Sequence, residues 1–353
     1  MNNPTDRADP IHLASPDWLL AGFDEARELF QFARVSRQSY YDSSFLDHRI
    51  KPMPRRVATA TGSEIDSTLA TLASRPAAYV FHTAFCASTL LAFCLDHPSR
   101  TLVLREPKVL VRLAGLQRDI PSPDSVPRGL LKQRVFGMLD RSYAGESVVI
   151  KPSNYANALL RDVLNQRTGA GEQHRCIMLS NGLRSLVISI LKKEPEAREQ
   201  LPAFVGALLR DSDYLKNIDL PPLESLDLLQ QSVVFWHCQR HFIQCIRKEC
   251  GIGCMLPVSM EAFLLHPLDT LVEINEFLHL GLSEVLLSNA VEAGAFRQHS
   301  KTGAGYSPEQ QRFEADAIAE RYDGEIRRAL KWARPMLDSI PIEPFSEEEN
   351  CST

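Results

Sequence analysis

Short apolar runs alternate with helical segments through the middle of this chain, and this alternation constrains the fold more than any other feature. Four runs have the length and composition of buried strands, and a helical pattern follows each of them. A fifth run contains a proline, which is typical of an edge strand or a strand end. Such alternation forms parallel sheets that are covered on both faces, so the sequence predicts a three-layer α/β/α fold with a mostly parallel sheet. The five runs are Ala78–Phe81, Leu102–Leu104, Val148–Ile150, Cys176–Leu179 and Met255–Val258.

The segments that flank these runs read as helices. Between residues 11 and 50, the apolar side chains include Trp18, Phe23 and Phe30, and two prolines at 52 and 54 end the pattern. A chain of this length can bury one large core or two small ones. The predicted organisation is a helical N-terminal extension (1–75), one main domain (76–335) with long helical regions at about 201–248 and 270–330, and a C-terminal tail (336–353) whose acidic end, 347–353, is expected to fray.

Composition excludes several classes of ligand and location. The net charge of −5 and the pI near 6.1 give no global attraction to nucleic acid or to an anionic membrane, so an anionic ligand needs a local site. No apolar run approaches the roughly 18 residues of a membrane span. The start of the chain lacks a secretion signal, and the eight cysteines have no framework spacing. We therefore expect a cytoplasmic protein with reduced thiols; the sequence defines no oligomeric state.

The loop between the first strand and the next helix is a candidate anion site. His82 and Thr83 end the strand, and Ser88 and Thr89 open the helix Ser88–Leu95. Unpaired backbone N–H groups and the helix dipole attract anions at such a position, and two hydroxyls add donors. The loop is not a Walker A motif because it has no glycine and no lysine. The alternative is an ordinary strand–helix turn that Ser88 caps.

The ends of the other strands carry further polar residues. Ligands of open α/β sheets bind beyond the carboxyl ends of the strands. Glu106, Lys151, Ser180 and Asn181 all follow or end a predicted strand, so we expect them to lie at one edge with the loop. The structural alternative for Glu106 is a salt bridge with a neighbouring cation, and for Lys151 a solvated surface position.

The order and spacing of these motifs resemble the sulfotransferase family over about residues 76–335. Its members transfer a sulfuryl group from 3′-phosphoadenosine 5′-phosphosulfate (PAPS), and the resemblance implies a P-loop fold of that type. The matching segments are Phe85-Cys86-Ala87-Ser88-Thr89 for the [K/R]-S-G-T-T loop, Val149–Pro152 for D-K-T-P, Ile177–Ser189 for R-D-P-R-x-x-x-x-S, and Ser259–Pro267 for R-Y-E-D-L-x-x-D-P.

The resemblance also implies roles for individual residues. A glutamate at about the position of Glu106 is the catalytic base in the tyrosylprotein branch of the family, and Lys151 would stabilise the bridging oxygen or a phosphate. His82 is the next candidate for the base and a possible loop cation. The acceptor would be a hydroxyl or amine on a small or conjugated molecule, and no metal is required. The implied PAPS-binding residues are Thr83, Phe85, Cys86, Ala87, Ser88, Thr89, Asn181, Arg184, Ser189 and Lys301.

The loop departs from the family pattern in its charges. Phe85 stands where the family has a basic residue, Ala87 where it has glycine, and Asn181 where an arginine opens the 3′-phosphate segment. Two phosphate-neutralising cations are therefore missing, and Arg184 and Lys301 are among the residues that would replace them. A non-catalytic relative of the family is a second interpretation.

Two other interpretations follow from the remaining polar residues. An ATP-dependent kinase-like enzyme would need a magnesium-binding acid, for which Asp96 and Glu106 are the nearby candidates. His237 and His241 are spaced to share a helix face with several cysteines, but the apolar residues between them favour a packed amphipathic helix over a metal site. Cys86 at a helix start lacks the arginine that a phosphatase loop would place six residues later.

Overall fold

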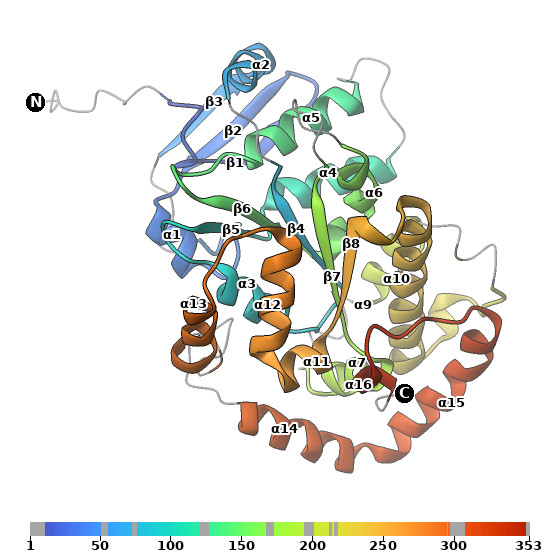
Figure 1. Ribbon diagram of the computed structural model, residues 1–353. Coiled ribbons are helices and arrows are strands. Elements are labelled where there is room, and N and C mark those ends of the chain that lie inside the picture. Colours follow the sequence, from blue (N-terminus) through green and yellow to red (C-terminus); the bar gives the residue numbers. More distant parts are fainter. Residues whose placement is uncertain are drawn as a thin grey trace, which may run out of the picture.

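A five-stranded parallel sheet forms the centre of the protein (Figure 1). The computed structural model describes residues 11–50, 56–72, 76–119, 127–166, 173–193, 201–211, 214, 218–294, 296 and 308–350. The strand order is β5-β6-β4-β7-β8, so the strand that precedes the candidate loop is central. All five predicted strands are present, and β8, which contains Pro257, lies at an edge as expected. The strands are β4 (Ala78–His82), β5 (Thr101–Arg105), β6 (Ser147–Lys151), β7 (Arg175–Ser180) and β8 (Met255–Ser259).

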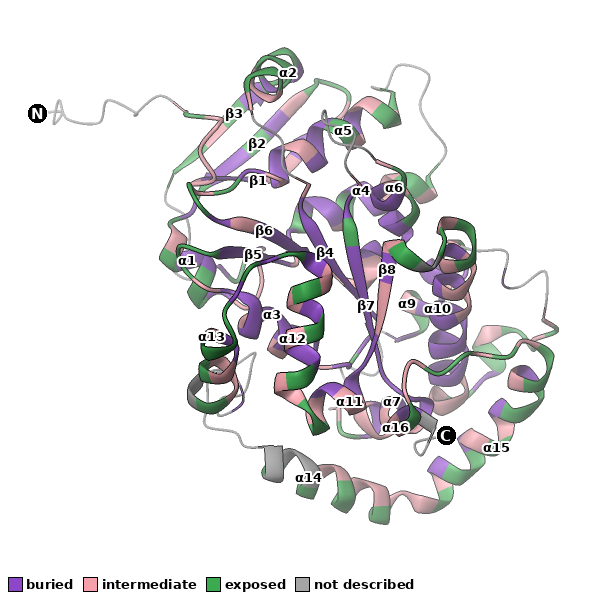
Figure 2. Cartoon of the chain, in the orientation of Figure 1, coloured by how far each residue is buried: buried purple, intermediate pink, exposed green. Residues whose placement is uncertain are grey.

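Helices cover both faces of this sheet, which confirms the predicted three-layer arrangement. Tyr79 and Phe81 of β4 face one layer, whereas Ala78 and Val80 face the other, as the alternation of a strand requires. Figure 2 shows that the strands are buried almost throughout. The first layer contains α4 (Lys108–Arg118), α5 (Arg128–Leu139), η1 (Asn154–Leu159) and α6 (Leu160–Asn165), and the second α3 (Ser88–Leu95), α11 (Met260–Leu265), α12 (Pro267–Leu278), α13 (Glu284–Asn289) and the π-helical turn η5 (Ala290–Gly294).

A third cluster of helices packs around α10, the longest helix. Asp227 and Gln230 form a capping box at the start of α10, and Gly251 ends it with a φ of 88°. Its first half packs in this cluster, and Phe242, Ile243 and Ile246 of its second half pack in the first layer. The cluster contains α7 (Leu183–Leu191), α9 (Leu201–Leu208), η3 (Leu223–Ser225), α10 (Leu228–Cys250), α14 (Pro308–Arg321) and α15 (Asp323–Ser339), and η4 (Ile252–Cys254) follows α10.

The predicted helical N-terminal extension is wrong. A three-stranded antiparallel sheet with the order β1-β2-β3 occupies this region, together with two short helices. Phe30 and Phe32 are buried on either side of exposed Gln31, which is the period of a strand, and the Asp24 carboxylate accepts hydrogen bonds from the N–H groups of Ala26 and Arg27 in the connecting turn. The elements are β1 (Trp18–Asp24), β2 (Leu29–Arg34), α1 (Arg37–Asp42), β3 (Val57–Thr61) and α2 (Gly62–Thr71).

Within the described residues, the first and last segments of the chain pack against the main domain. Core residues of β1 and β2 belong to the same apolar cluster as the first helical layer, so the two sheets share one core. The predicted boundary at 335/336 falls inside α15, which continues to Ser339. The expectation that the acidic end frays is wrong for its first part: α16 (Glu347–Asn350) packs against α11, and Glu349 is buried (Figure 1).

Candidate active site

The loop that joins β4 to α3 has an unusual backbone. Phe85 and Ala87 adopt φ values of 59° and 60°, which side chains with a Cβ disfavour. Ala87 is the N-cap of α3 and has no polar side chain with which to cap it. The N-cap side chain therefore accepts no hydrogen bond from the first N–H groups of α3, and the hydroxyls of Ser88 and Thr89 lie at the same helix end. The alternative in which Ser88 caps the helix is wrong, because Ala87 is the N-cap residue.

Asn181, which follows β7, holds this loop in place. Its amide group donates to the carbonyl oxygens of Ala84 and Phe85 at 3.3 Å each, and its side-chain oxygen lies 3.2 Å from the Thr83 hydroxyl. The indole N–H of Trp236 donates to the Asn181 carbonyl at 2.7 Å. Asn181 is fully buried, so its side chain holds the loop from the side of the protein core.

Glu106 and Lys151 form an ion pair at the carboxyl ends of β5 and β6. The Lys151 ammonium lies 2.5 Å from Oε1 of Glu106, and the Glu106 N–H donates to the Lys151 carbonyl at 2.7 Å. The Lys151 side chain is completely buried, whereas 19% of the Glu106 side chain is exposed. Glu106 also has a left-handed backbone, with φ at 53°. Non-glycine residues held in this region cluster at functional sites.

His82 lies between the loop and the Lys151 segment. One ring nitrogen lies 2.7 Å from the Thr83 carbonyl oxygen and the other 3.0 Å from that of Pro152. Two carbonyl acceptors suit a protonated ring, but burial and then the charge of Lys151 lower the pKa of His82 to about 4. The ring is therefore neutral at neutral pH, although the Glu106 carboxylate opposes this shift, and the ring can donate to only one of the two carbonyl oxygens. This arrangement favours a structural role over that of a base or a loop cation.

The remaining predicted residues are two on α7, one outside the described residues, and Cys86 of the loop itself. Arg184 and Ser189 are half-buried on α7, which begins two residues after Asn181. Lys301 lies outside the described residues. Cys86 donates its S–H to the Thr83 carbonyl, and burial raises the pKa of its thiol to about 12, so it has no nucleophilic character.

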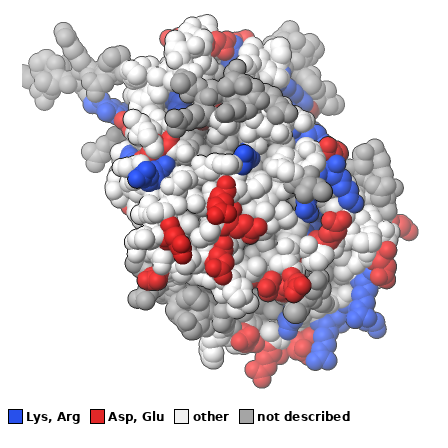
Figure 3. Space-filling view, in the orientation of Figure 1, with Lys and Arg blue, Asp and Glu red and all other residues white. Residues whose placement is uncertain are grey.

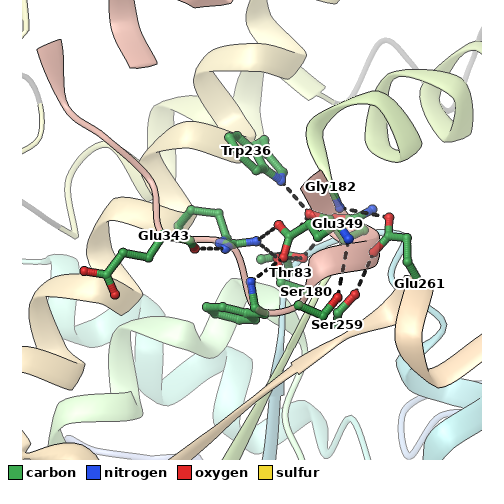
Figure 4. A network of polar contacts seen from close by, with 12 residues as sticks. Thr83, Ser180, Gly182, Trp236, Ser259, Glu261, Glu343 and Glu349 are labelled. Carbon is green, nitrogen blue, oxygen red and sulfur yellow. Dashed lines mark hydrogen bonds and ion pairs between the residues drawn. The ribbon is translucent and has the colours of Figure 1, made fainter. Parts of the chain in front are cut away.

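Two cations near the site were not found from the sequence. The Lys193 ammonium, at the end of α7, lies 5.2 Å from the ring centroid of Phe85, so a cation does reach the loop where the family has a basic residue. Arg240 on α10 donates to the Ser180 hydroxyl, which in turn accepts from Thr83 (Figure 4). No local pattern marks Arg240 in the sequence, because Gln244 and Arg247 follow it at helical spacing on the same face.

The residues of the other interpretations are engaged elsewhere. The Asp96 carboxylate is buried and accepts from Arg105 at 2.8 Å and Arg37 at 2.7 Å, which leaves it poorly placed to bind magnesium. His237 contacts the Tyr214 hydroxyl at 2.6 Å and the Ile340 carbonyl at 2.8 Å through its two ring nitrogens. Within the described residues, no group of three or more His, Cys, Asp or Glu side chains is arranged to hold a metal ion.

Surface charges are mixed on the face that carries α12. Acidic side chains gather over α12, and basic side chains extend along α15 at the lower edge (Figure 3). No helix in the described part of the chain is long and apolar enough to cross a membrane.

Comparison with known proteins returns sulfotransferase domains among solved structures. No protein-family model and no curated protein matches the chain. It is similar to the sulfotransferase domain from the curacin biosynthetic pathway, at 13% identity and a TM-score of 0.42, over 79% of this chain and 97% of that one. It is also similar to the sulfotransferase domain of the Synechococcus PCC 7002 olefin synthase (14% identity, TM-score 0.38, 71% and 95% covered). A third similar structure is a sulfotransferase from Alicyclobacillus acidocaldarius (13% identity, TM-score 0.35, 74% and 99% covered). At these values the likeness carries no argument about activity.

Proposed function

We propose that the protein transfers a sulfuryl group from PAPS to a hydroxyl or amine acceptor at the carboxyl edge of its parallel sheet. The observation that carries the proposal is the Glu106–Lys151 pair beside the start of α3, whose N-cap residue Ala87 has no polar side chain. It joins a carboxylate and a buried ammonium next to a backbone anion site, which are the groups that sulfuryl transfer needs.

The donor set near the loop fits an anionic ligand of this kind. Backbone N–H groups at the start of α3 and the hydroxyls of Ser88 and Thr89 suit the oxygens of a phosphosulfate. Lys151 supplies a positive charge at the next strand end, close enough to lower the pKa of His82 and to oppose the rise in the pKa of Cys86. Lys193 adds a second charge at Phe85. PAPS supplies an activated sulfuryl group with adenosine 3′,5′-bisphosphate as the leaving group.

The proposal gives a defined role to each residue of the candidate site. Glu106 accepts the proton of the acceptor hydroxyl or amine as the bond to sulfur forms, and its partly exposed carboxylate is accessible to such a group. Lys151 orients Glu106 and places positive charge where the leaving oxygen becomes negative. Asn181 and Thr83 fix the loop, so the N–H groups of α3 are directed before the ligand arrives.

A non-catalytic nucleotide-binding relative is the second candidate. Phe85, which is 36% exposed, stands at the position of the family's basic residue. The Asn181 amide group already donates to two carbonyl oxygens of the loop. Both features weaken direct phosphate neutralisation. The kinase-like alternative has less support, because Asp96 is paired with two arginines and Glu106 with Lys151.

Calorimetric titration separates these functions. Purified protein is titrated with adenosine 3′,5′-bisphosphate, with and without magnesium, and in parallel with ATP. The proposal predicts metal-independent binding of the bisphosphate that a Ser88→Ala, Thr89→Ala double variant loses. Binding of Mg-ATP alone would support the kinase-like function, and binding of neither by a folded protein would support the non-catalytic relative.

A further inference from the structure

Arg240 is a buried guanidinium at the same edge of the sheet as the loop. It lies in the middle of α10 and is 1% exposed. Its Nη1 donates to the Ser180 hydroxyl at 3.1 Å, and the Thr83 hydroxyl donates to the same oxygen at 3.2 Å (Figure 4). Two hydrogen bonds therefore connect Arg240 to the first residue of the loop. A buried arginine needs an anionic partner, because desolvation of its charge is costly.

The partner of Arg240 is a carboxylate from the C-terminal end of the chain. Glu349 of α16 pairs with Nη1 of Arg240, and its other oxygen accepts from the N–H of Phe345 at 2.7 Å. The second amino group of Arg240 donates to the Glu343 carbonyl at 2.5 Å. The guanidinium also lies 3.9 Å from the ring centroid of Phe345, which is favourable for a cation. The Glu349 carboxylate thus neutralises the Arg240 guanidinium, and a backbone N–H of its own segment holds it in that position.

The segment that carries Glu349 is held by polar contacts and by three half-buried apolar side chains, Ile340, Ile342 and Phe345, which pack against the core clusters. We define the C-terminal segment as residues 340–349, which run along α10. The Gln244 amide donates to the Pro341 carbonyl and accepts from the Glu343 N–H, both at 3.2 Å. Glu349 is the only buried side chain between 341 and 349; the others are exposed or half-buried. Segments with so little burial open at a low free energy.

Further positive charge lies beside this segment. A cavity of about 370 Å³ separates part of α10 from Glu343 and Phe345. Arg240, Arg247 and Lys248 line its α10 side. When the C-terminal segment moves away, Arg240 loses its carboxylate, and these cations remain around it. Such a site attracts a phosphate or sulfate group, whose oxygens match the fork of a guanidinium as a carboxylate does.

We infer that Arg240 and Ser180 form a phosphate-binding subsite beside the loop between β4 and α3, and that Glu349 occupies this subsite as an internal competitor. Arg240 then supplies the charge that Asn181 does not. The inference rests on the proposed function in one respect, which is that the ligand is the phosphorylated adenosine donor. A ligand phosphate displaces the Glu349 carboxylate, so binding and release of the C-terminal segment are coupled.

The test compares two anions with four proteins by calorimetry. The anions are adenosine 3′,5′-bisphosphate and inorganic pyrophosphate; the proteins are the full-length wild type, Glu349→Gln, the double variant Arg240→Lys/Glu349→Gln, and Glu347→Gln as the matched control. The Glu347 side chain is exposed on the same helix, α16. We expect Glu349→Gln to bind both anions about ten-fold more tightly, because a competitor that occupies nine-tenths of the molecules lowers affinity by that factor. The double variant should lose at least that gain, and Glu347→Gln should match the wild type.

Hydrogen exchange of the wild type provides a readout that needs no variant to fold. Addition of either anion should increase exchange in residues 340–349. The subsite is overturned if bisphosphate binding depends on Ser88 and Thr89, Glu349→Gln has the affinity of the wild type, and exchange in residues 340–349 does not change on binding. The proposed function stands in that case. Tight binding of pyrophosphate without bisphosphate would keep the subsite and remove the PAPS assignment. Failure of both anions to bind folded Glu349→Gln would remove the subsite and the proposed donor together.

Discussion

The ammonium of Lys151 lies 2.5 Å from the Glu106 carboxylate, and each residue stands at the carboxyl end of one of two neighbouring parallel strands. The register of β5 with β6, which pairs Arg105 with Lys151, sets this relationship. Glu106 then turns out of the sheet with a left-handed backbone, while Arg105 is committed to Asp96. Arg105 and Glu106 are adjacent in the sequence but form separate ion pairs. Arg105 pairs with Asp96 inside the core, and Glu106 pairs with Lys151 at the edge of the sheet.

The first prediction concerns Glu106. Glu106→Gln should lower the rate of sulfuryl transfer by about 10²-fold or more, because the amide cannot accept a proton. Affinity for adenosine 3′,5′-bisphosphate should change little, since the amide oxygen still accepts from Lys151. Steady-state rates with a phenolic or alcohol acceptor and calorimetry give the two quantities. Glu273→Gln, at an exposed position of α12, is the control, and equal rates for both variants would move the base elsewhere.

The second prediction uses two adjacent lysines. Lys193 approaches the Phe85 ring at the loop, whereas Lys192 pairs with Glu314 of α14. Lys193→Gln should weaken bisphosphate binding by roughly three- to ten-fold, in line with one charge-assisted contact to an anion. Lys192→Gln should leave the affinity unchanged. Equal effects of the two variants in calorimetry would mean that Lys193 acts only through the general charge of the protein.

The third prediction concerns the strain at Ala87. Its φ of 60° costs about 1 kcal/mol for a residue with a Cβ, so Ala87→Gly should raise the free energy of unfolding by up to about that amount. Ala92→Gly, in the interior of the same helix, should lower it by about 1 kcal/mol or more. Urea denaturation measures both. The same sign for the two variants would contradict the left-handed conformation at Ala87.

The fourth prediction is a pH dependence that arises from His82. Burial lowers its pKa to about 4 in the folded protein, against about 6.5 when unfolded. Between these values the unfolded chain binds a proton that the folded protein does not, so stability falls as the pH is lowered through this window. The contribution is roughly 2 kcal/mol between pH 7 and pH 5. The free energy of unfolding of His82→Asn should therefore depend less on pH by this amount; parallel curves for variant and wild type would show that His82 is not the cause.

Local sequence patterns predicted the parallel sheet because its strands are apolar on both faces. Val148–Ile150 and Cys176–Leu179 cannot alternate in polarity when helices cover both sides, and turn residues mark their ends. The same reasoning failed at Trp18, Phe23 and Phe30. Phe23 and Phe30 are seven residues apart, as on one face of a helix, but all three residues lie on two strands joined at the Asp24 turn. Only the alternation around Gln31 indicated a half-exposed sheet.

The parts of the site that follow strands were predictable for the same reason. Glu106, Lys151 and Asn181 lie at one edge because parallel strands end together. Lys193, Arg240 and Glu349 were not predictable, since they reach the loop region through tertiary packing. Glu349 meets Arg240 across 109 residues of sequence, and no periodic pattern records such a contact.

Hydrogen exchange of the loop itself tests most directly whether the sulfuryl donor binds at the start of α3. Wild-type protein is compared with and without adenosine 3′,5′-bisphosphate, in the absence of magnesium, and exchange is followed by peptide. The account predicts slower exchange in residues 83–91, where backbone N–H groups would contact the ligand. Binding that leaves these amides unchanged, or that protects a different part of the protein, would contradict it.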